Sequence, residues 1–514
     1  MLGRRTGSEQ ESGRLHDLLH RRMPLSTPAW AAIALVTLFF LCLSTMAILR
    51  FEAYRTRSFD LAIVVRMLWG IRHGDFHEFF TNQPWIAYHF EPLMLVLSLF
   101  DALAPAVHGL LVAQSAAIAA TGLVAYRLGA RLLGSPAAGV LATAVVLLYP
   151  AIGHVGVFDV HMVAFAIAPA LWLLDALDRG DRPEALLAAA LTVACREDGF
   201  VFVALALLAV PAESRAAMVR RVAAAVACLA AFAAYVLLVQ QPLTSGGALH
   251  AHFAAFGATP SEILWTLVTE PGRIVDALVT PRTGKYLATL LVPLALLPLA
   301  APRRSLPAVW TIALNLLSQA PGTADIIDSH YSALAIPALL YGAFHGAANV
   351  RSWLARTPAG PRAGIVVPAL LLLAAVIAGQ AAWGTLPGAG EYLPDDFRLT
   401  DRSTRMDTLV SRIQADGDAS CSLPIDAVAH VAQRPQPFVL PDGITEATWV
   451  LADLDSRGVI GADAARYQAR IRGWIDRALA SGMDVIDQQG PLVLLRRRPR
   501  RRPPRGRRRV ARIP

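Results

Sequence analysis

The chain has 514 residues, of which 55% are hydrophobic and 17% charged, and its mean hydropathy is +0.47. Soluble domains carry about 25% charged residues, so this composition excludes an ordinary soluble protein and predicts one that crosses a membrane repeatedly. The formal charge of +9 does not indicate a nucleic-acid partner. Eleven arginines lie within residues 496–512, and subtracting them from +9 leaves the rest of the chain near −2.

Long apolar segments predict an all-α bundle of about eleven membrane-spanning helices. Residues 1–27 form an arginine-bearing tail, and the first span, near 28–50, is too long for the apolar core of a signal peptide. The membrane domain is expected over residues 28–386, with a large first outer loop at 51–106. The later spans are expected near residues 107–126, 136–151, 159–177, 183–195, 199–211, 222–241, 286–301, 305–320, 332–348 and 364–386.

Arginine placement predicts the orientation of the bundle. The connections after the second, fourth, sixth, eighth and tenth spans all carry arginines, and cytoplasmic loops are rich in Lys and Arg. We therefore expect a multi-pass protein of the cell membrane, with the N-terminus in the cytoplasm and the C-terminal part outside. This count requires residues 183–211 to form a hairpin of two short segments. A single 29-residue span there would invert everything that follows.

The first outer loop contains two polar features. Residues 59–72 predict an amphipathic helix that lies in the plane of the membrane interface. Asp60 stands at its start, where an acidic residue serves either as a helix cap or as a general base or metal ligand. His89 and Glu91 follow before Pro92. They converge if the chain turns there and diverge if it is extended.

Two further pairs of polar residues lie at the outer ends of spans. Asp159 and His161 open the fourth span, where the structural alternative is a capping Asp followed by a first-turn His. His330 and Tyr331 precede the tenth span. Ionisable groups at membrane depth are costly and indicate a functional site by default.

The Arg196-Glu197-Asp198 triplet is the sharpest of these signals. It separates two apolar segments, so its three charges must be paired or reached by water. Arginine offers a bidentate fork suited to phosphate, and the two carboxylates offer a base or metal ligands. The alternative is an internal ion cluster that only stabilises the tip of the hairpin.

The C-terminal region predicts a small α/β domain over residues 387–495. Helical and alternating apolar patterns follow one another there, and about 100 residues suffice for one core. Four polar residues of this region are interpreted as surface or capping residues: Asp426, His430, Asp453 and Asp455. Residues 496–514 form an Arg- and Pro-rich tail with too few apolar residues to fold, and the tail is suited to anionic lipid.

Together these motifs resemble a family of predicted bacterial membrane proteins of unknown function. The resemblance covers about residues 30–495. It rests on Phe59-Asp60-Leu61 with the following Trp69 and Gly70, His89-Phe90-Glu91-Pro92, Phe158-Asp159-Val160-His161, Arg196-Glu197-Asp198-Gly199 and His330-Tyr331. That family more often has Lys-Glu-Asp at the triplet. It in turn resembles the GT-C membrane glycosyltransferases, which combine many spans with an acidic residue in a large first outer loop and use polyprenyl-phosphate sugar donors. The matching acidic position is Asp60, without the paired acids of the GT-C motif.

The resemblance implies a transferase of the cell envelope that takes a lipid-linked sugar donor at the outer face. Arg196 would hold the donor phosphate, and Asp60, Glu197 or Asp198 would deprotonate the acceptor hydroxyl. A divalent metal ion on Asp159, His161 or Glu197 would stabilise the leaving phosphate. The remaining expected substrate contacts are His89, Glu91, His330 and Tyr331. Two alternatives stay open: a transporter or flippase, and a non-catalytic scaffold of the envelope.

Overall fold

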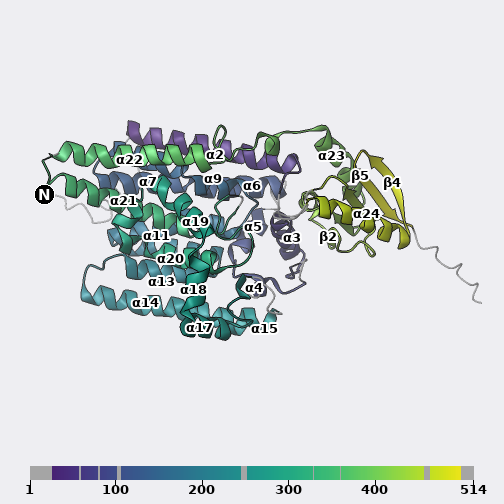
Figure 1. Cartoon of the computed structure of the whole chain (residues 1–514), viewed down its shortest axis with the longest axis horizontal. Helices are drawn as coiled ribbons and strands as arrows, with labels where there is room; N and C mark the ends of the chain where they lie inside the picture. The colour runs from purple at the N-terminus through teal and green to yellow at the C-terminus, as the bar shows by residue number, and fades with distance from the viewer. Residues whose placement is uncertain are drawn as a thin grey trace, which may run out of the picture.

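The computed structural model describes residues 26–56, 59–78, 82–100, 106–244, 252–327, 329–358, 360–456 and 464–498. A long helical bundle occupies most of the molecule, and a small α/β domain sits at one end of it (Figure 1). The bundle contains α2 (Thr27–Glu52), α3 (Asp60–Arg72), α4 (Trp85–Tyr88), α5 (Leu93–Phe100), α6 (Ala106–Ala119), α7 (Thr121–Leu133), α8 (Pro136–Leu147), α9 (Pro150–Val157), α10 (Met162–Phe165), α11 (Ile167–Arg179), α12 (Arg182–Cys195), α13 (Asp198–Ala209), α14 (Arg215–Ala234), η1 (Tyr235–Gln240), α15 (Gln241–Leu243), α17 (Pro260–Thr269), α18 (Pro271–Leu278), α19 (Pro281–Leu291), η2 (Val292–Leu294), η3 (Leu297–Ala300), α20 (Pro302–Leu317), α21 (Ala335–Leu354) and α22 (Gly360–Trp383).

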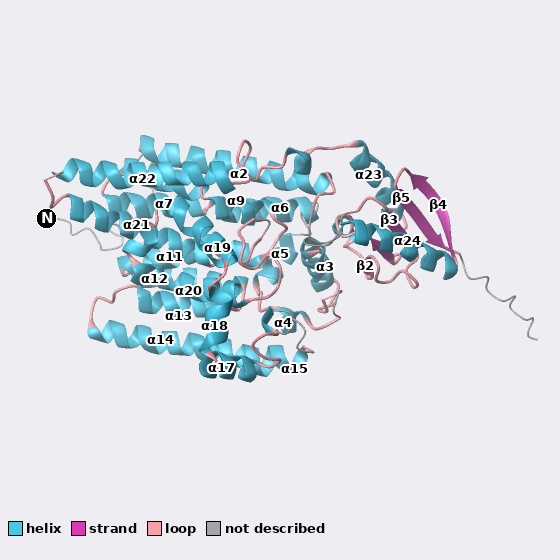
Figure 2. Cartoon of the chain, viewed as in Figure 1, coloured by secondary structure: helices cyan, strands magenta, loops and turns pink. Residues whose placement is uncertain are grey.

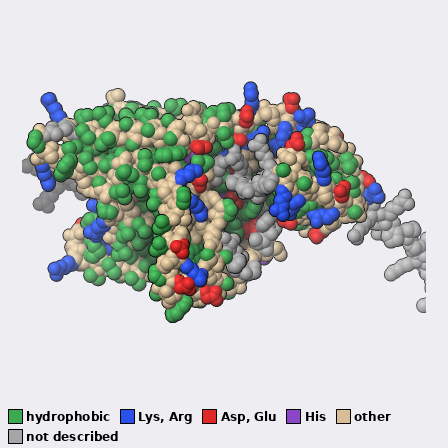
Figure 3. Space-filling model, in the orientation of Figure 1, with side chains coloured by type: hydrophobic (Ala, Val, Ile, Leu, Met, Phe, Trp, Pro, Cys, Tyr) green, Lys and Arg blue, Asp and Glu red, His purple; other side chains and the backbone are tan. Residues whose placement is uncertain are grey.

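Within the described residues, four helical stretches are long and apolar enough to cross a membrane. They are α2, Val107–Leu133 (α6 with α7), Arg215–Leu243 (α14 to α15) and α22. The pair α8 and α9, bent by 52°, would make a fifth. The expected count of eleven spans is therefore not confirmed. The face of the bundle in Figure 3 is mainly hydrophobic, whereas charged side chains gather over the α/β domain.

The predicted break between residues 195 and 199 is present. Helix α12 ends at Cys195 and α13 begins at Asp198. Gly199 explains how α13 can fold back on α12, because a Cβ at this position would lie 2.6 Å from the carbonyl oxygen of Thr192. Only glycine allows so close an approach of two backbones. The Arg196-Glu197-Asp198 triplet thus lies at the turn between two short apolar helices.

The arginines of the predicted cytoplasmic connections meet at one end of the bundle. Buried Asp175 of α11 contacts the guanidinium groups of Arg127, Arg131 and Arg179. Asp178 contacts Arg131 and, on α20, Arg304. The loops that the positive-inside rule places on one side are therefore neighbours in space. Helix α2 starts at the end remote from the α/β domain and finishes beside that domain (Figure 1).

Helix α3 differs from the predicted interfacial helix. Both of its faces are buried, from Leu61 to Leu68, and Arg66 is 3% exposed. The α/β domain covers the polar face of the helix, which carries Arg66. This side chain binds Asp75 and donates to the carbonyl oxygen of Pro435. The helix is therefore packed between the bundle and the domain rather than lying in the membrane surface.

The C-terminal domain is a five-stranded mixed sheet with helices against it (Figure 2). The strand order is β2-β1-β3-β5-β4, with β1 parallel to β2 and β3, and β5 antiparallel to β3 and β4. Its core joins the sheet to α24 through Trp474, Ile471 and Leu495. The elements are η4 (Pro394–Phe397), α23 (Asp401–Gln414), β1 (Cys421–Leu423), η5 (Val428–Val431), β2 (Pro437–Val439), β3 (Trp449–Asp453), α24 (Ala464–Ala480), β4 (Met483–Gln489) and β5 (Leu492–Arg497).

Three residues interpreted as surface or capping groups instead have partners at the junction between domain and bundle, where Asp426 and His430 are partly buried. Arg402 binds Asp453 at 2.6 Å and Asp426 at 2.7 Å, and Asp453 is fully buried. His430 lies between the rings of Phe51 and Tyr54. The sequence interpretation was wrong for these residues because their partners are distant along the chain.

The boundary between the domain and the arginine-rich tail lies later than expected. Strand β5 runs to Arg497, and Arg496 stacks on Trp449 while pairing with Asp416 at 3.0 Å. Arg498 binds Asp484. Arg497 donates to the carbonyl oxygens of Ala447 and Ser481. These three arginines of the predicted tail therefore have partners within the folded domain. Residues 499–514 and the N-terminal residues 1–25 lie outside the described residues.

Candidate functional site

Every predicted site residue lies at a helix start or in a break between helices. Asp60 opens α3, and His89 and Glu91 stand between α4 and α5. Asp159 and His161 connect α9 to α10, while the triplet connects α12 to α13 and His330-Tyr331 precede α21. At such breaks, backbone N–H and C=O groups lack their helical hydrogen-bond partners, and inside a membrane protein they need other polar partners. The breaks therefore account for why polar side chains collect here.

A first group of side chains consists of Asp60, His161 and His330, which we call the acid–imidazole group. The Nε2 atom of His161 lies 3.1 Å from Oδ2 of Asp60, and its Nδ1 lies 2.7 Å from the carbonyl oxygen of Asp159. A carbonyl only accepts, so Nδ1 carries a proton. A second proton must then lie between Nε2 and the carboxylate, as an imidazolium–carboxylate pair or its neutral equivalent. The pair is thus built to hold and transfer one proton.

Asp60 does not act as the N-cap of α3. Phe59 occupies the cap position, and the helix has no side-chain cap hydrogen bond. The carboxylate of Asp60 turns instead toward His161, 101 residues further along the chain. Of the two interpretations that the sequence left open for Asp60, the capping one is wrong. The position at the start of the helix still favours a negative charge there, through the helix dipole.

The acid–imidazole group also fits a divalent metal ion. The candidate ligand atoms of Asp60, His161 and His330 lie within 4.8 Å of one another, and they form such a group within the described residues. The Nδ1 of His330 is buried and makes no hydrogen bond to described residues. A ligating histidine usually donates its other N–H to a carbonyl or carboxylate, as His161 does. The rings of His161 and His330 stack at 3.5 Å between centroids, so His330 would have to tilt before both nitrogens could face one ion.

A second group joins the hairpin tip to the outer loop and consists of His89, Arg196, Glu197 and Asp198; we call it the tip group. Glu197 accepts at 2.8 Å from Nδ1 of His89 with one oxygen and at 3.0 Å from the backbone N–H of Phe90 with the other. Both of its oxygens are engaged. Glu197 is therefore suited to fixing the outer loop on the hairpin, and Asp60 and Asp198 remain as candidate bases.

The guanidinium of Arg196 makes no hydrogen bond to the part of the chain that the structure describes. Its Nε lies 3.4 Å from Asp198 and 3.8 Å from Glu197. The side chain is 20% exposed. A guanidinium has five N–H donors, and a phosphate accepts two of them in parallel. The arrangement leaves Arg196 able to bind an anion with its terminal nitrogens.

Charge links the two groups. Glu91 is buried beside His89 and Glu197, and burial raises the pKa of its carboxyl. Burial lowers the pKa of His330 well below its usual value, and the charges of His161, Arg196 and His89 lower it further. Burial opposes protonation of His89, but the carboxylate of Glu197 outweighs it and raises the pKa of His89. Groups that perturb one another in this way share one electrostatic environment.

Asp159 and Tyr331 take different places from those expected. The carboxyl of Asp159 is buried outside the acid–imidazole group, and only its backbone carbonyl contacts His161. Tyr331 packs its ring on His330 at 4.2 Å. The metal ligand set that the structure favours is therefore Asp60 with His161 and His330 in place of Asp159 with His161.

Sequence reasoning missed two buried amides that position the site. The Oε1 of Gln114 accepts at 2.9 Å from the backbone N–H of His161. Asn315 donates to the carbonyl oxygen of Tyr331 at 3.1 Å and to the hydroxyl of Tyr286 at 2.8 Å. Both stand alone within apolar helical segments, and an isolated amide inside a predicted span is the signal that could have revealed them.

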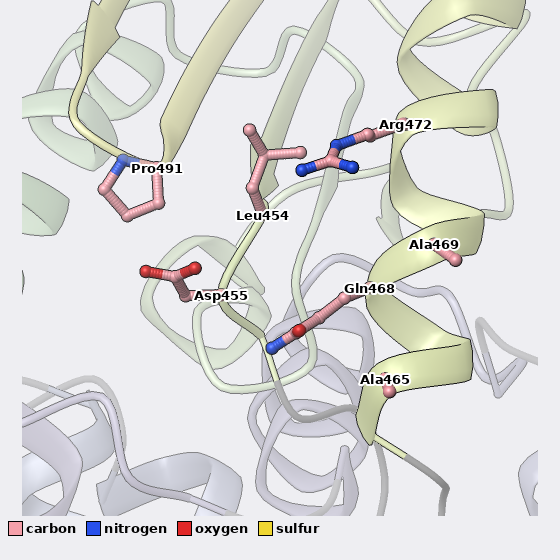
Figure 4. Close-up of a pocket in the computed structure, with 7 residues that line it drawn as sticks. All are labelled: Leu454, Asp455, Ala465, Gln468, Ala469, Arg472 and Pro491. Carbon is pink, nitrogen blue, oxygen red and sulfur yellow. The ribbon is translucent and has the colours of Figure 1, made fainter.

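A separate cavity of about 370 Å³ lies in the α/β domain (Figure 4). Gln468 and Arg472 of α24 face Asp455 and Leu454 at the end of β3, with Pro491 opposite. None of the residues that line it belongs to either group described above. The cavity is therefore not part of the candidate site.

Comparisons with known proteins identify a family and solved structures of similar fold. The profile of a family described as predicted membrane protein (DUF2079) matches residues 50–466. The chain is similar to the crystal structure of ArnT from Cupriavidus metallidurans bound to undecaprenyl phosphate, with 14% identity and a TM-score of 0.46; the match covers 91% of this chain and 98% of that one. No curated protein sequence matches the chain significantly.

Proposed function

We propose that this chain, which belongs to the DUF2079 family of predicted membrane proteins, is a membrane transferase that moves a sugar from a polyprenyl-phosphate carrier to a hydroxyl acceptor. The observation that carries the proposal is the Asp60–His161 pair, which shares a proton at 3.1 Å in the same electrostatic environment as the open fork of Arg196. A proton acceptor beside an anion-binding group is the minimum that glycosyl transfer requires.

The position of the site supports a lipid-linked donor. Helix α5 begins two residues after Glu91 and exposes Leu95, Val96 and Leu99, the last of them at 70%. This apolar surface adjoins the outer loop that Glu197 fixes. A carrier lying in the bilayer could place its chain against α5 while its phosphate reaches Arg196. A soluble nucleotide-linked donor would not need such a surface.

The chemical step follows from these positions. The acceptor hydroxyl attacks the anomeric carbon of the sugar, and the bond between that carbon and the phosphate oxygen breaks. The phosphate leaves with the electron pair, and the guanidinium of Arg196 stabilises its charge. Before the transfer, His161 keeps the shared proton, so that Asp60 is ionised and can then take the proton of the hydroxyl. Asp198 and Glu197 keep Arg196 and the outer loop in place.

A metal ion would be held by Asp60, His161 and His330. When bound, it would supply charge stabilisation for a phosphate. The acid–imidazole pair and a metal compete for the same atoms, since the proton between Nε2 and Oδ2 must leave before an ion binds. Metal dependence would thus appear as an effect that increases with pH.

We further propose that the site and the α/β domain face the outside of the cell. The arginine-bearing connections gather at the opposite end of the bundle, and such connections are cytoplasmic in most membrane proteins. An outward site suits a polyprenyl carrier, whose sugar is used in building the envelope.

The experiment is a donor-cleavage assay with purified full-length protein in lipid nanodiscs. A panel of polyprenyl-monophosphate hexoses and pentoses is supplied, and released polyprenyl phosphate is quantified. Asp60→Asn should lower turnover by about 100- to 10,000-fold, with the protein still folded by gel filtration. Asp484→Asn is the matched control, since Asp484 is an exposed acid of β4 that pairs with Arg498.

Two results would overturn the proposal. Full turnover in Asp60→Asn would show that Asp60 is not the catalytic base. Absence of any release by the unaltered protein across the panel would favour the transporter or the scaffold. A transport assay distinguishes these two alternatives. A transporter would move the intact carrier or solute across the membrane of a sealed vesicle without cleaving it, whereas a scaffold would not.

A further inference from the structure

A groove lies on the outside of the bundle at the end remote from the α/β domain. Its volume is about 240 Å³. Helix α8 forms one wall with Ala138 and Leu141, α22 forms the other with Pro368 and Ala369, and Leu133 closes the groove from α7. Sites that enclose a whole small molecule measure roughly 300–1,000 Å³. The groove is thus too small for such a ligand, but it is suited to one segment of a hydrocarbon chain.

Arg351 of α21 stands at the polar end of this groove. Its guanidinium lies against Gly134, where a Cβ would be 3.2 Å from Nη1. Gly134 has a φ of 79°, in the left-handed region that favours glycine, and it lets the guanidinium approach the α7–α8 turn. The side chain is only partly exposed.

No described residue neutralises Arg351. The side chain makes neither a hydrogen bond nor an ion pair to the part of the chain that the structure describes. In contrast, Arg127, Arg131 and Arg304 at the same end all contact carboxylates. Neither residues 129–150 nor residues 349–390 contain an Asp or Glu. A partly buried charge beside an apolar groove requires an anion from outside the chain, or water.

The surface around the groove is apolar. Helix α22 exposes Val366, Leu370 and Leu371, and Trp353, two residues after Arg351 on α21, is 64% exposed. Tryptophan favours the boundary between hydrocarbon and headgroups. In a bilayer, this arrangement would put the guanidinium at headgroup depth, with the groove running from it into the hydrocarbon layer.

We propose that this groove binds one anionic phospholipid. Its phosphate would accept hydrogen bonds from the fork of Arg351, and one acyl chain would lie between α8 and α22. Arg356 and Arg362 follow nearby without acidic partners in sequence, so the local field favours a lipid with net negative charge over a zwitterionic one. The site is independent of the proposed transferase function and lies at the opposite end of the bundle.

Native mass spectrometry of the full-length protein in detergent tests this site, with phosphatidylglycerol and phosphatidylcholine as probes. The unaltered protein should retain one phosphatidylglycerol in preference to phosphatidylcholine. Arg351→Gln should weaken phosphatidylglycerol binding at least about tenfold and abolish the preference. Ala369→Phe, which fills the apolar part, should weaken both lipids. Arg215→Gln removes an exposed arginine from the start of α14 and should behave like the unaltered protein.

Three outcomes would overturn the proposal. Equal losses in Arg351→Gln and Arg215→Gln would mean that the lipid follows overall charge rather than this site. Unchanged binding in Ala369→Phe would mean that no chain occupies the groove. Competition by glycerol phosphate as effective as that of phosphatidylglycerol would indicate a simple anion site. Gel filtration of each variant shows whether it folds. Arg351→Lys keeps the charge and loses the fork, so its loss of phosphatidylglycerol binding should be intermediate.

Discussion

Acid should loosen the junction between the α/β domain and the bundle, and His430 is the residue responsible. Its ring is stacked between Phe51 at 3.8 Å and Tyr54 at 4.0 Å, and its Nε2–H donates to the carbonyl oxygen of Phe51 at 3.2 Å. Burial between these rings lowers the pKa of His430 to about 3, with a further contribution from the neighbouring His108. The folded junction therefore holds a neutral histidine.

The size of the effect follows from proton linkage. A histidine freed from the junction has a pKa of about 6.5, so the open state takes up a proton as the pH falls below that value, while the closed state does not. The junction keeps its full stability above about pH 6.5 and loses it progressively as the pH falls toward 3. At pH 5 the loss is about 2 kcal/mol, since each pH unit contributes about 1.4 kcal/mol. This corresponds to roughly a thirtyfold increase in opening.

Hydrogen–deuterium exchange at η5 and at the end of α2 measures this opening directly. Rates corrected for the intrinsic pH dependence of exchange should rise about thirtyfold between pH 7 and pH 5 in the unaltered protein. His430→Phe keeps an aromatic ring in the stack and should remove the pH dependence. His73→Phe, a change at an exposed histidine stacked on Trp69, is the control and should keep it. The same pH dependence in His430→Phe would refute the assignment.

Three further predictions concern the tip group and the orientation. Glu197→Gln should cost about 3 kcal/mol of stability, because it leaves a histidine without its buried partner; an unchanged unfolding midpoint would show that the contact is dispensable. Arg196→Lys should raise the KM for a polyprenyl-linked donor about tenfold with a smaller change in kcat, because the charge stays and the fork is lost; an unchanged KM would remove Arg196 from donor binding. Cysteines at Ser261 and Thr404 should react with an impermeant thiol reagent in intact cells and one at Arg356 only after permeabilisation; the reverse pattern would invert the topology.

The positions of the helix breaks could be predicted from sequence, and these breaks define the candidate site. The alternation of apolar segments with short polar motifs places Arg196-Glu197-Asp198 at a turn between α12 and α13, and α13 does begin at Asp198. The same reasoning identifies Asp60, His161 and His330 as candidates. Burying a charge inside an apolar segment costs so much free energy that such a residue can be recognised as a candidate from the sequence alone.

The partners across these breaks could not be predicted, because they depend on how distant segments pack. Whether Asp159 or His161 faces Asp60 is decided by the path of the short connection between α9 and α10, and spacing alone favours neither. Helix α3 shows the same limit. Its pattern indicates one solvent-facing side, but the domain covers that side through contacts such as Arg66 with Pro435, 369 residues away.

Arg196 and the Asp60–His161 pair are proposed to serve one substrate. A cryo-electron microscopy structure with a non-cleavable polyprenyl-phosphate sugar analogue would show whether they do. We expect the phosphate within hydrogen-bonding distance of the terminal nitrogens of Arg196, the anomeric carbon on the side of Asp60, and the chain along α5. A phosphate bound elsewhere, with Arg196 and Asp60 both out of reach of the analogue, would contradict this proposal.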